Sequence, residues 1–168
     1  MKTLTIWSLI FSLFICSCIQ QQIKSQIEKL MIALQAGDTS SALIIVQKID
    51  SINFIVDFSG EISDFSGKTP LMYSSERGYL NVTKALINKG AKLDLKNDFG
   101  LTALMYTCYS PIERPEVVRL LLNNGANLDL QDNAGETALI FACKEGHAEV
   151  VKILLEKAAM PKRSAFVL

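Results

Sequence analysis

The chain has 168 residues, of which 49% are hydrophobic and 20% are charged, and its 17 basic residues balance 17 acidic ones. This composition fits one globular domain with a buried core and excludes a disordered tail, a collagenous fibre and a disulfide-dense miniprotein. The charge balance also argues against a nucleic-acid-binding protein, because such proteins need a basic surface that neutralises phosphates.

The first 20 residues have the pattern of an export signal. A single basic residue, Lys2, precedes an apolar run from Leu4 to Ile19, and this order is typical of a signal peptide. A transmembrane helix is the alternative, but the run is shorter than the roughly 20 residues that a helix needs to cross a bilayer. We expect residues 1–17 to form a signal peptide that is removed on export.

The end of this apolar run, Ile15-Cys16-Ser17-Cys18, resembles the lipobox of bacterial lipoproteins. In that motif the last cysteine is acylated and becomes the new N-terminus, although Cys16 stands where the family usually has Ala, Ser or Thr. The resemblance implies a lipid on Cys18, a tether over residues 18–25, and a protein held on a membrane of the cell envelope, facing the periplasm. An ordinary signal peptide without a lipid is the alternative.

Helical periodicity begins in residues 26–68. Residues 27–38 predict a first helix that ends at Gly37-Asp38, and residues 42–49 predict a second helix. The β-prone segment 53–58 then predicts a long connection, extended as a hairpin with its turn at Ser59-Gly60. We expect this region to be a degenerate first copy of the unit that repeats downstream.

From residue 69 onward the chain repeats itself. Thr69-Pro70-Leu71-Met72-Tyr73 recurs 33 residues later as Thr102-Ala103-Leu104-Met105-Tyr106, and after a further 35 residues as Thr137-Ala138-Leu139-Ile140-Phe141. Each copy is followed by a second apolar helix and a polar turn. A period of 33 with Thr-Pro-Leu at the head of a helix resembles the ankyrin-repeat family.

The resemblance implies an all-α solenoid of helix-turn-helix units with β-hairpin fingers. Its units are the degenerate repeat 26–68 and the repeats 69–101, 102–136 and 137–168 of one ankyrin-repeat domain, 26–168. The family pattern has a histidine where this chain has Met72, Met105 and Ile140, so we expect lost side-chain hydrogen bonds to the capping threonines and lower stability. Two extra residues within 109–115, which holds two prolines, replace the usual turn of the third unit.

No catalytic constellation is visible in the sequence. The one histidine, His147, falls at a turn between two helices, and a lone imidazole cannot build a zinc site. Cys108 and Cys143 are predicted to be small core residues, and Tyr73, Tyr106 and Phe141 to form a stacked core column. We therefore expect no enzymatic activity, no metal and no cofactor.

The resemblance implies that the fingertips and the inner face of the first helices bind another protein. The candidate contact residues are Phe65, Lys68, Glu76, Arg77, Lys96, Asp98, Phe99, Leu101, Tyr109, Ser110, Asn133, Glu136, Lys144 and Glu145. The most informative of these are Phe65, Phe99, Leu101 and Tyr109, because apolar side chains on outward turns are not expected to pack into the core. The alternative is that the fingers pack on each other.

These patterns predict a monomeric, exported and lipid-anchored protein that binds another protein through its concave face and fingers. An inhibitor or immunity-like factor is one such role. The alternatives are a secreted effector that acts in a host cell and an accessory subunit of an enzyme.

Overall fold

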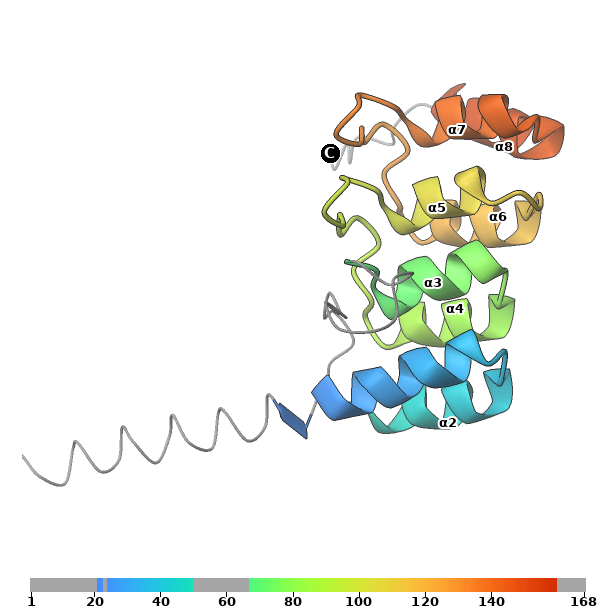
Figure 1. The fold of residues 1–168 in the computed structure, drawn as a ribbon. Coiled ribbons are helices and arrows are strands. Elements are labelled where there is room, and N and C mark those ends of the chain that lie inside the picture. The colour runs from blue at the N-terminus through green and yellow to red at the C-terminus, as the bar shows by residue number, and fades with distance from the viewer. Residues whose placement is uncertain (1–20, 23, 50–66, 160–168) are drawn as a thin grey trace, which may run out of the picture.

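The computed structural model describes residues 21–22, 24–49 and 67–159, which form a stack of helix pairs (Figure 1). The pairs are the helical residues 24–35 with α2 (Thr39–Lys48), α3 (Pro70–Arg77) with α4 (Leu80–Asn88), α5 (Ala103–Tyr109) with α6 (Pro115–Asn123), and α7 (Ala138–Glu145) with α8 (Ala148–Ala159). The all-α solenoid is therefore confirmed. The expected β-hairpin fingers are not seen in the described residues, where residue 68 forms only an isolated bridge.

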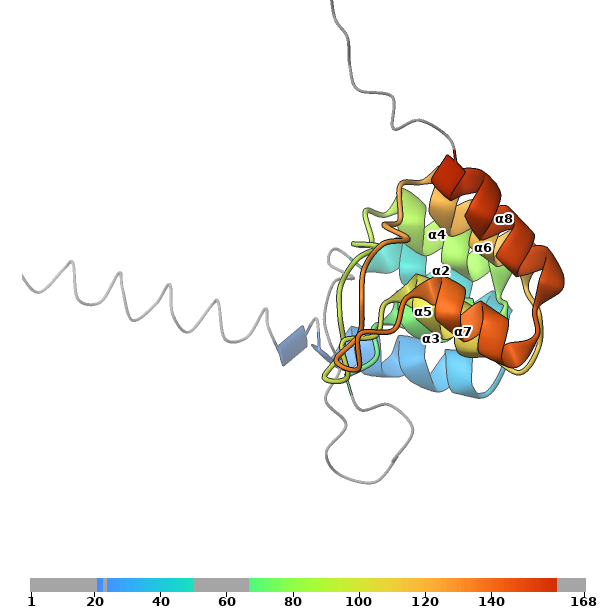
Figure 2. The ribbon, with the colours of Figure 1, turned by 90° about the horizontal axis from the view of Figure 1, so that it is seen from above.

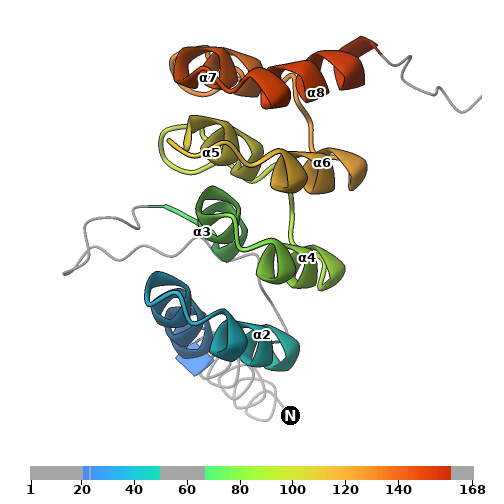
Figure 3. The same ribbon diagram turned by 90° about the vertical axis from the view of Figure 1, so that its right-hand side faces the viewer.

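The helices form two layers (Figures 2 and 3). The first helices α3, α5 and α7 pack side by side, and the second helices α2, α4, α6 and α8 form the other layer. The long connections that follow α4 and α6 project from one side of the stack, on the left in Figure 1. This arrangement fixes the position of each finger relative to the outer surface of the first-helix layer, which we call the first-helix face.

Threonine caps begin the first helices. Thr69 Oγ1 accepts a hydrogen bond from the backbone N–H of Met72 across 3.2 Å, and the sulfur of Met72 accepts one from the N–H of Thr69 across 3.3 Å. Thr102 and Met105 repeat this exchange at 3.4 Å in both directions. The expectation that every cap loses its side-chain bond is thus wrong for two repeats, where a weak sulfur acceptor takes the place of histidine. Ile140 offers no acceptor.

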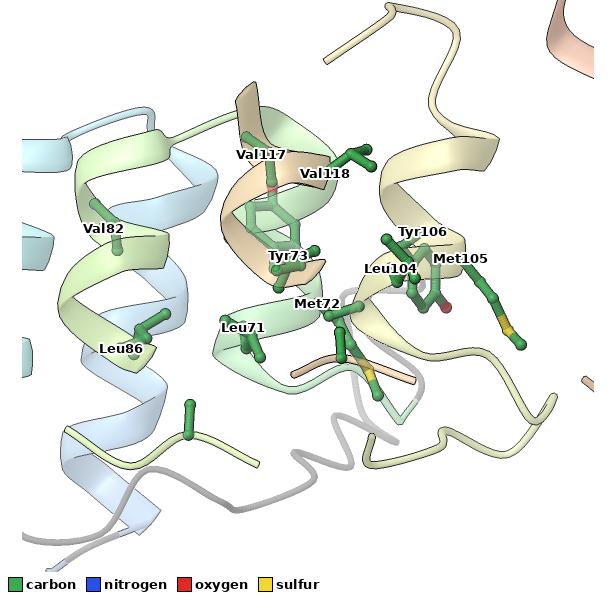
Figure 4. Packing of buried hydrophobic residues seen from close by; sticks show 14 of the residues in the cluster. Leu71, Met72, Tyr73, Val82, Leu86, Leu104, Met105, Tyr106, Val117 and Val118 are labelled. Carbon is green, nitrogen blue, oxygen red and sulfur yellow. The ribbon is translucent and has the colours of Figure 1, made fainter. Parts of the chain in front are cut away.

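The core lies between successive helix pairs. Tyr73, Tyr106 and Phe141 are all buried, as predicted for a stacked column. Tyr73 and Tyr106 belong to one cluster with apolar side chains from α4 and α6, such as Val82 and Val117, which Figure 4 draws together with them. Each unit therefore buries its apolar face against its neighbours, as expected for a solenoid.

The last described helix pair has an open face. Met105 is 1% exposed beneath the next pair, whereas Ile140, at the same repeat position, is 38% exposed. Cys108 is buried but its equivalent Cys143 is exposed, and both are free thiols. The prediction that Cys143 is a core residue is therefore wrong, because no further helix pair of the described residues stacks on α7 and α8.

Several predictions concern residues outside the described ranges. These are the signal peptide 1–17, the lipidation site Cys18, the β-prone segment 53–58 and the contact residue Phe65. In the part of the chain that the structure describes, no helix combines the length and apolar character needed to span a bilayer.

Candidate protein-binding surface

Asn97 organises the finger formed by residues 91–101. Its Oδ1 accepts hydrogen bonds from the backbone N–H groups of Phe99 and Leu101, at 3.1 and 2.8 Å. Its Nδ2 donates to the phenol oxygen of Tyr106 across 2.8 Å. The buried asparagine thereby holds the finger in one conformation and leaves the Phe99 side chain 59% exposed.

The next finger, residues 126–136, uses the same device. Asp132 Oδ1 accepts from the backbone N–H groups of Ala134 and Glu136, at 2.9 and 2.8 Å. An Asx turn of this kind needs Asn or Asp at one fixed place in the finger. Asn97 and Asp132, which begin the predicted finger turns 97–101 and 132–136, carry this signal in the sequence.

The two fingers are also bonded to each other. The backbone N–H of Asn133 donates to the carbonyl of Phe99 across 3.0 Å, and its side-chain amide donates to the carbonyl of Asp98 across 2.9 Å. Lys96 Nζ donates to the carbonyl of Gln131 across 2.7 Å. The alternative that the fingers pack on each other therefore holds for the finger backbones, which are bonded to each other while the Phe99 side chain stays exposed.

An ion pair marks the first-helix face of the repeat 69–101. Lys68 Nζ lies 2.9 Å from Glu76 Oε2 and 4.5 Å from the centroid of the Tyr106 ring. Both charged side chains are mostly covered, which limits their availability to a partner. Burial, followed by the charges of Glu76 and Asp98, raises the pKa of Tyr106 to about 12, so this phenol stays neutral at ordinary pH.

The equivalent positions differ in the two later repeats. Glu136, directly before the repeat 137–168, and Lys144 within it form an ion pair of reversed polarity. The same positions of the middle repeat are Leu101, directly before the repeat 102–136, and Tyr109 within it. An apolar pair, Leu101 and Tyr109, therefore lies between two ion pairs on this face. The pattern is visible only when residues eight apart are compared between repeats.

Tyr109 is the exposed residue of this apolar pair. Its side chain is 52% exposed, and its ring packs edge-on against Phe141 with the centroids 5.7 Å apart and the planes at 75°. Leu101 is half-buried and packs against the core. The Tyr109 ring thus packs on Phe141 while much of its surface stays open to solvent, which suits a side chain that anchors a binding partner.

Ser110, the neighbour of Tyr109, is buried. Its carbonyl lies 2.7 Å from Nε2 of His147, which is also buried. The structural role predicted for His147 is therefore observed as a contact that ties the turn before α8 to the end of α5. Ser110 supports the surface and does not form part of it.

The other candidate contact residues fall into two groups. The exposed ones are Arg77, Lys96, Asp98, Phe99, Tyr109, Asn133, Lys144 and Glu145, and the half-buried ones are Lys68, Glu76, Leu101 and Glu136. Ile112, which is not among the contact residues predicted from the sequence, is 60% exposed on the loop after Tyr109. The two prolines around Ile112 were the signal that this loop has a fixed shape.

Groups for metal or thiol chemistry do not converge in the described residues. Among them, no cluster of three or more His, Cys, Asp or Glu side chains could hold a metal ion. Burial raises the pKa of the Cys108 thiol to about 12, which keeps it in the unreactive protonated form.

Comparison with known families agrees with the helix-pair geometry. Residues 9–97 and 89–164 match the family described as "Ankyrin repeats (3 copies)". The chain belongs to the ankyrin-repeat family. Ankyrin repeats imply protein–protein interaction, and in this ankyrin-repeat protein the exposed aromatic side chains lie on fixed fingers and helix ends.

A plant protein is similar to part of this ankyrin-repeat chain. The "Probable E3 ubiquitin-protein ligase XBOS33" of Oryza sativa subsp. japonica is 32% identical over 82 residues, which cover 48% of this chain and 14% of the rice protein. The chain therefore corresponds to a small part of that relative's length.

Proposed function

We propose that this ankyrin-repeat protein is an exported, membrane-anchored, non-enzymatic monomer that binds another protein through its first-helix face and fingers. The observation that carries the proposal is the pair of exposed aromatic side chains, Phe99 and Tyr109, at 59% and 52% exposure. Aromatic anchors tend to dominate binding energies at protein interfaces. Because both stand on hydrogen-bonded backbone, little conformational entropy is lost when a partner binds.

Substitution of the two aromatic residues tests the binding surface. Phe99→Ala with Tyr109→Ala should abolish crosslinking of the partner in native membranes while the helical circular-dichroism spectrum is unchanged. Ile44→Ala is the matched control, since Ile44 is similarly exposed but lies on α2 in the opposite layer. Unchanged crosslinking by the double variant would assign binding to another face.

The N-terminal sequence supports export and anchoring. Acyl chains on Cys18 would hold the protein on a membrane surface, since each buried methylene contributes about 0.8 kcal/mol. Mass spectrometry of the mature N-terminal peptide should find a modified Cys18, and Cys18→Ser should release the protein from membranes. An intact Met1 or an unmodified Cys18 would contradict the anchor.

An inhibitor or immunity-like factor is the role that we favour for such a scaffold. A rigid surface fixed before binding can occlude a site on a partner without chemistry of its own. An unacylated mature chain would favour the alternative, a secreted effector in a host cell, and an enzyme that is active only with this chain bound would favour an accessory subunit. The ligase activity of the rice relative is not carried over, since the overlap is 14% of that protein.

A further inference from the structure

The loop between α5 and α6, residues 110–114, is fastened to the repeat that follows it. Glu113 Oε1 accepts hydrogen bonds from the backbone N–H groups of Glu149 and Val150, at 2.8 and 3.0 Å, in the first turn of α8. A carboxylate is stabilising at this end of a helix, where the peptide dipoles leave partial positive charge. The contact between Ser110 and His147 holds the same side of the loop.

The loop is fastened to the preceding repeat as well. Arg114 Nε donates to the carbonyl of Glu76 across 2.9 Å. Its guanidinium rests on the turn between α3 and α4, where a Cβ on Gly78 would lie 2.1 Å from Arg114 Nη1. Contacts to both neighbours thus bridge three repeats and leave this loop little freedom.

The fastened loop presents apolar side chains outward. Ile112 is 60% exposed at its tip, Pro111 is exposed beside it, and Tyr109 precedes it at the end of α5. Holding large apolar side chains in solvent on a clamped loop has no benefit for folding. An apolar surface with a fixed shape is the usual mark of an interaction site.

Positive charge adjoins this apolar tip. Arg77 is exposed at the last turn of α3, and burial, followed by the nearby charge of Arg77, lowers the pKa of Arg114. Glu76 interacts with Arg114 but forms its ion pair with Lys68, and the guanidinium carbon of Arg77 lies 5.4 Å from the centroid of the Tyr73 ring. Within the described ranges, no carboxylate forms an ion pair with either arginine.

We propose that this edge, formed by Arg77, Tyr109, Ile112 and Arg114, binds an acidic segment of the partner protein that carries a large apolar side chain. The apolar side chain would lie against Tyr109 and Ile112, and neighbouring carboxylates would pair with the two arginines. A planar guanidinium suits this role, because it can bind a carboxylate through two parallel hydrogen bonds. The inference rests on the proposed protein-binding function and adds the chemistry of the partner.

A membrane surface is the competing occupant of a cationic and apolar edge. The neighbouring acidic side chains favour a protein, since Glu113 is exposed in the loop and Glu145 is exposed at the end of α7. Both would be repelled by anionic lipid headgroups. A protein segment can place its own charges to avoid them.

The test uses the processed full chain, labelled with ¹⁵N, and three blocked tetrapeptides. Asp-Glu-Phe-Glu should shift the amide signals of residues 109–114, and the shifts should weaken as salt is added. Lys-Lys-Phe-Lys and Asp-Glu-Ser-Glu should produce much smaller shifts, because each lacks one half of the recognised chemistry. Equal shifts with all three peptides, shifts elsewhere, or none at millimolar peptide would overturn the inference.

Two substitutions make the test specific to the edge. Arg77→Gln and Ile112→Ser should each weaken binding of Asp-Glu-Phe-Glu about tenfold, whereas Lys84→Gln, an exposed position on α4, should not. A different outcome is that the protein binds phosphatidylglycerol vesicles but not the peptide. If the two substitutions then abolished vesicle binding, the edge would be assigned to a membrane. If the cellular partner still crosslinks to Arg77→Gln and Ile112→Ser but not to the Phe99 and Tyr109 variant, the proposed function stands and this inference fails.

Discussion

Asn97 donates from its side-chain amide to the phenol oxygen of Tyr106 across 2.8 Å, so one buried contact fastens the finger 91–101 to α5. The carbonyl oxygen of the same side chain binds the backbone N–H groups of Phe99 and Leu101. The exposed aromatic of this finger is therefore positioned by a residue that is itself hidden from any partner.

Replacing Asn97 by Ala should destabilise the protein by about 3 kcal/mol, because three hydrogen bonds are lost, the buried one to Tyr106 and the two part-buried ones from Phe99 and Leu101. Tyr106→Phe, which removes only the phenol contact, should cost about 1 to 2 kcal/mol. Urea unfolding followed by circular dichroism measures both. An Asn97→Ala cost no larger than that of Tyr106→Phe would show that the finger bonds are not stabilising.

Gly100→Ala should disturb the junction of the two fingers. Gly100 has φ +80°, and an added Cβ would lie 2.7 Å from Asn133 Oδ1 and 2.8 Å from its backbone nitrogen. Gly135 has the same φ but meets nothing within 4 Å, so Gly135→Ala isolates the backbone strain of about 1 to 2 kcal/mol. We expect a clearly lower unfolding midpoint for Gly100→Ala than for Gly135→Ala, and equal midpoints would refute the close approach.

Stability should fall at alkaline pH through Tyr106. Its pKa is raised from 10.0 to about 12, so the folded state holds the phenol proton where the unfolded state releases it. The resulting stabilisation is complete below pH 10 and is lost as the pH rises through about 12. Urea midpoints measured across this range should decline less steeply in Tyr106→Phe, although the raised pKa of Cys108 adds a similar loss in both proteins.

The two repeat cysteines should differ in reactivity. In a chain with Cys16→Ser and Cys18→Ser, a disulfide reagent should modify the exposed Cys143 quickly and the buried Cys108 only after unfolding. Absorbance of the released thiolate counts the modified groups. The fast phase should disappear in a further Cys143→Ser variant, and a fast phase that persisted would mean that the interior around Cys108 opens readily.

The repeat architecture could be predicted because each unit carries its own local signals. Thr69, Thr102 and Thr137 cap helices through contacts three residues away, and such short-range chemistry is readable in the sequence. Gly78 and Gly146 end helices in the left-handed conformation that glycine favours.

The surface was less predictable because it depends on contacts between repeats. The burial of Ser110 and the exposure of Ile112 follow from bonds to His147, Glu149 and Glu76, which lie 36 to 38 residues away from their partners in the loop. Similarly, nothing in the repeat pattern says whether another unit covers Cys143. Position within a unit predicts a core residue only where the neighbouring unit is in place.

The exposed Ile140 and Leu155 offer a face on which the repeat array can be extended. Their equivalents Met105 and Leu122 are buried against the next pair, so the face beyond α7 and α8 already has the chemistry of an internal junction. A unit copied from residues 102–136 could be appended there without redesign of the junction, and in a nearest-neighbour description the longer array should unfold at higher denaturant concentration. The protein is thus a starting point for longer scaffolds that carry the same binding edge.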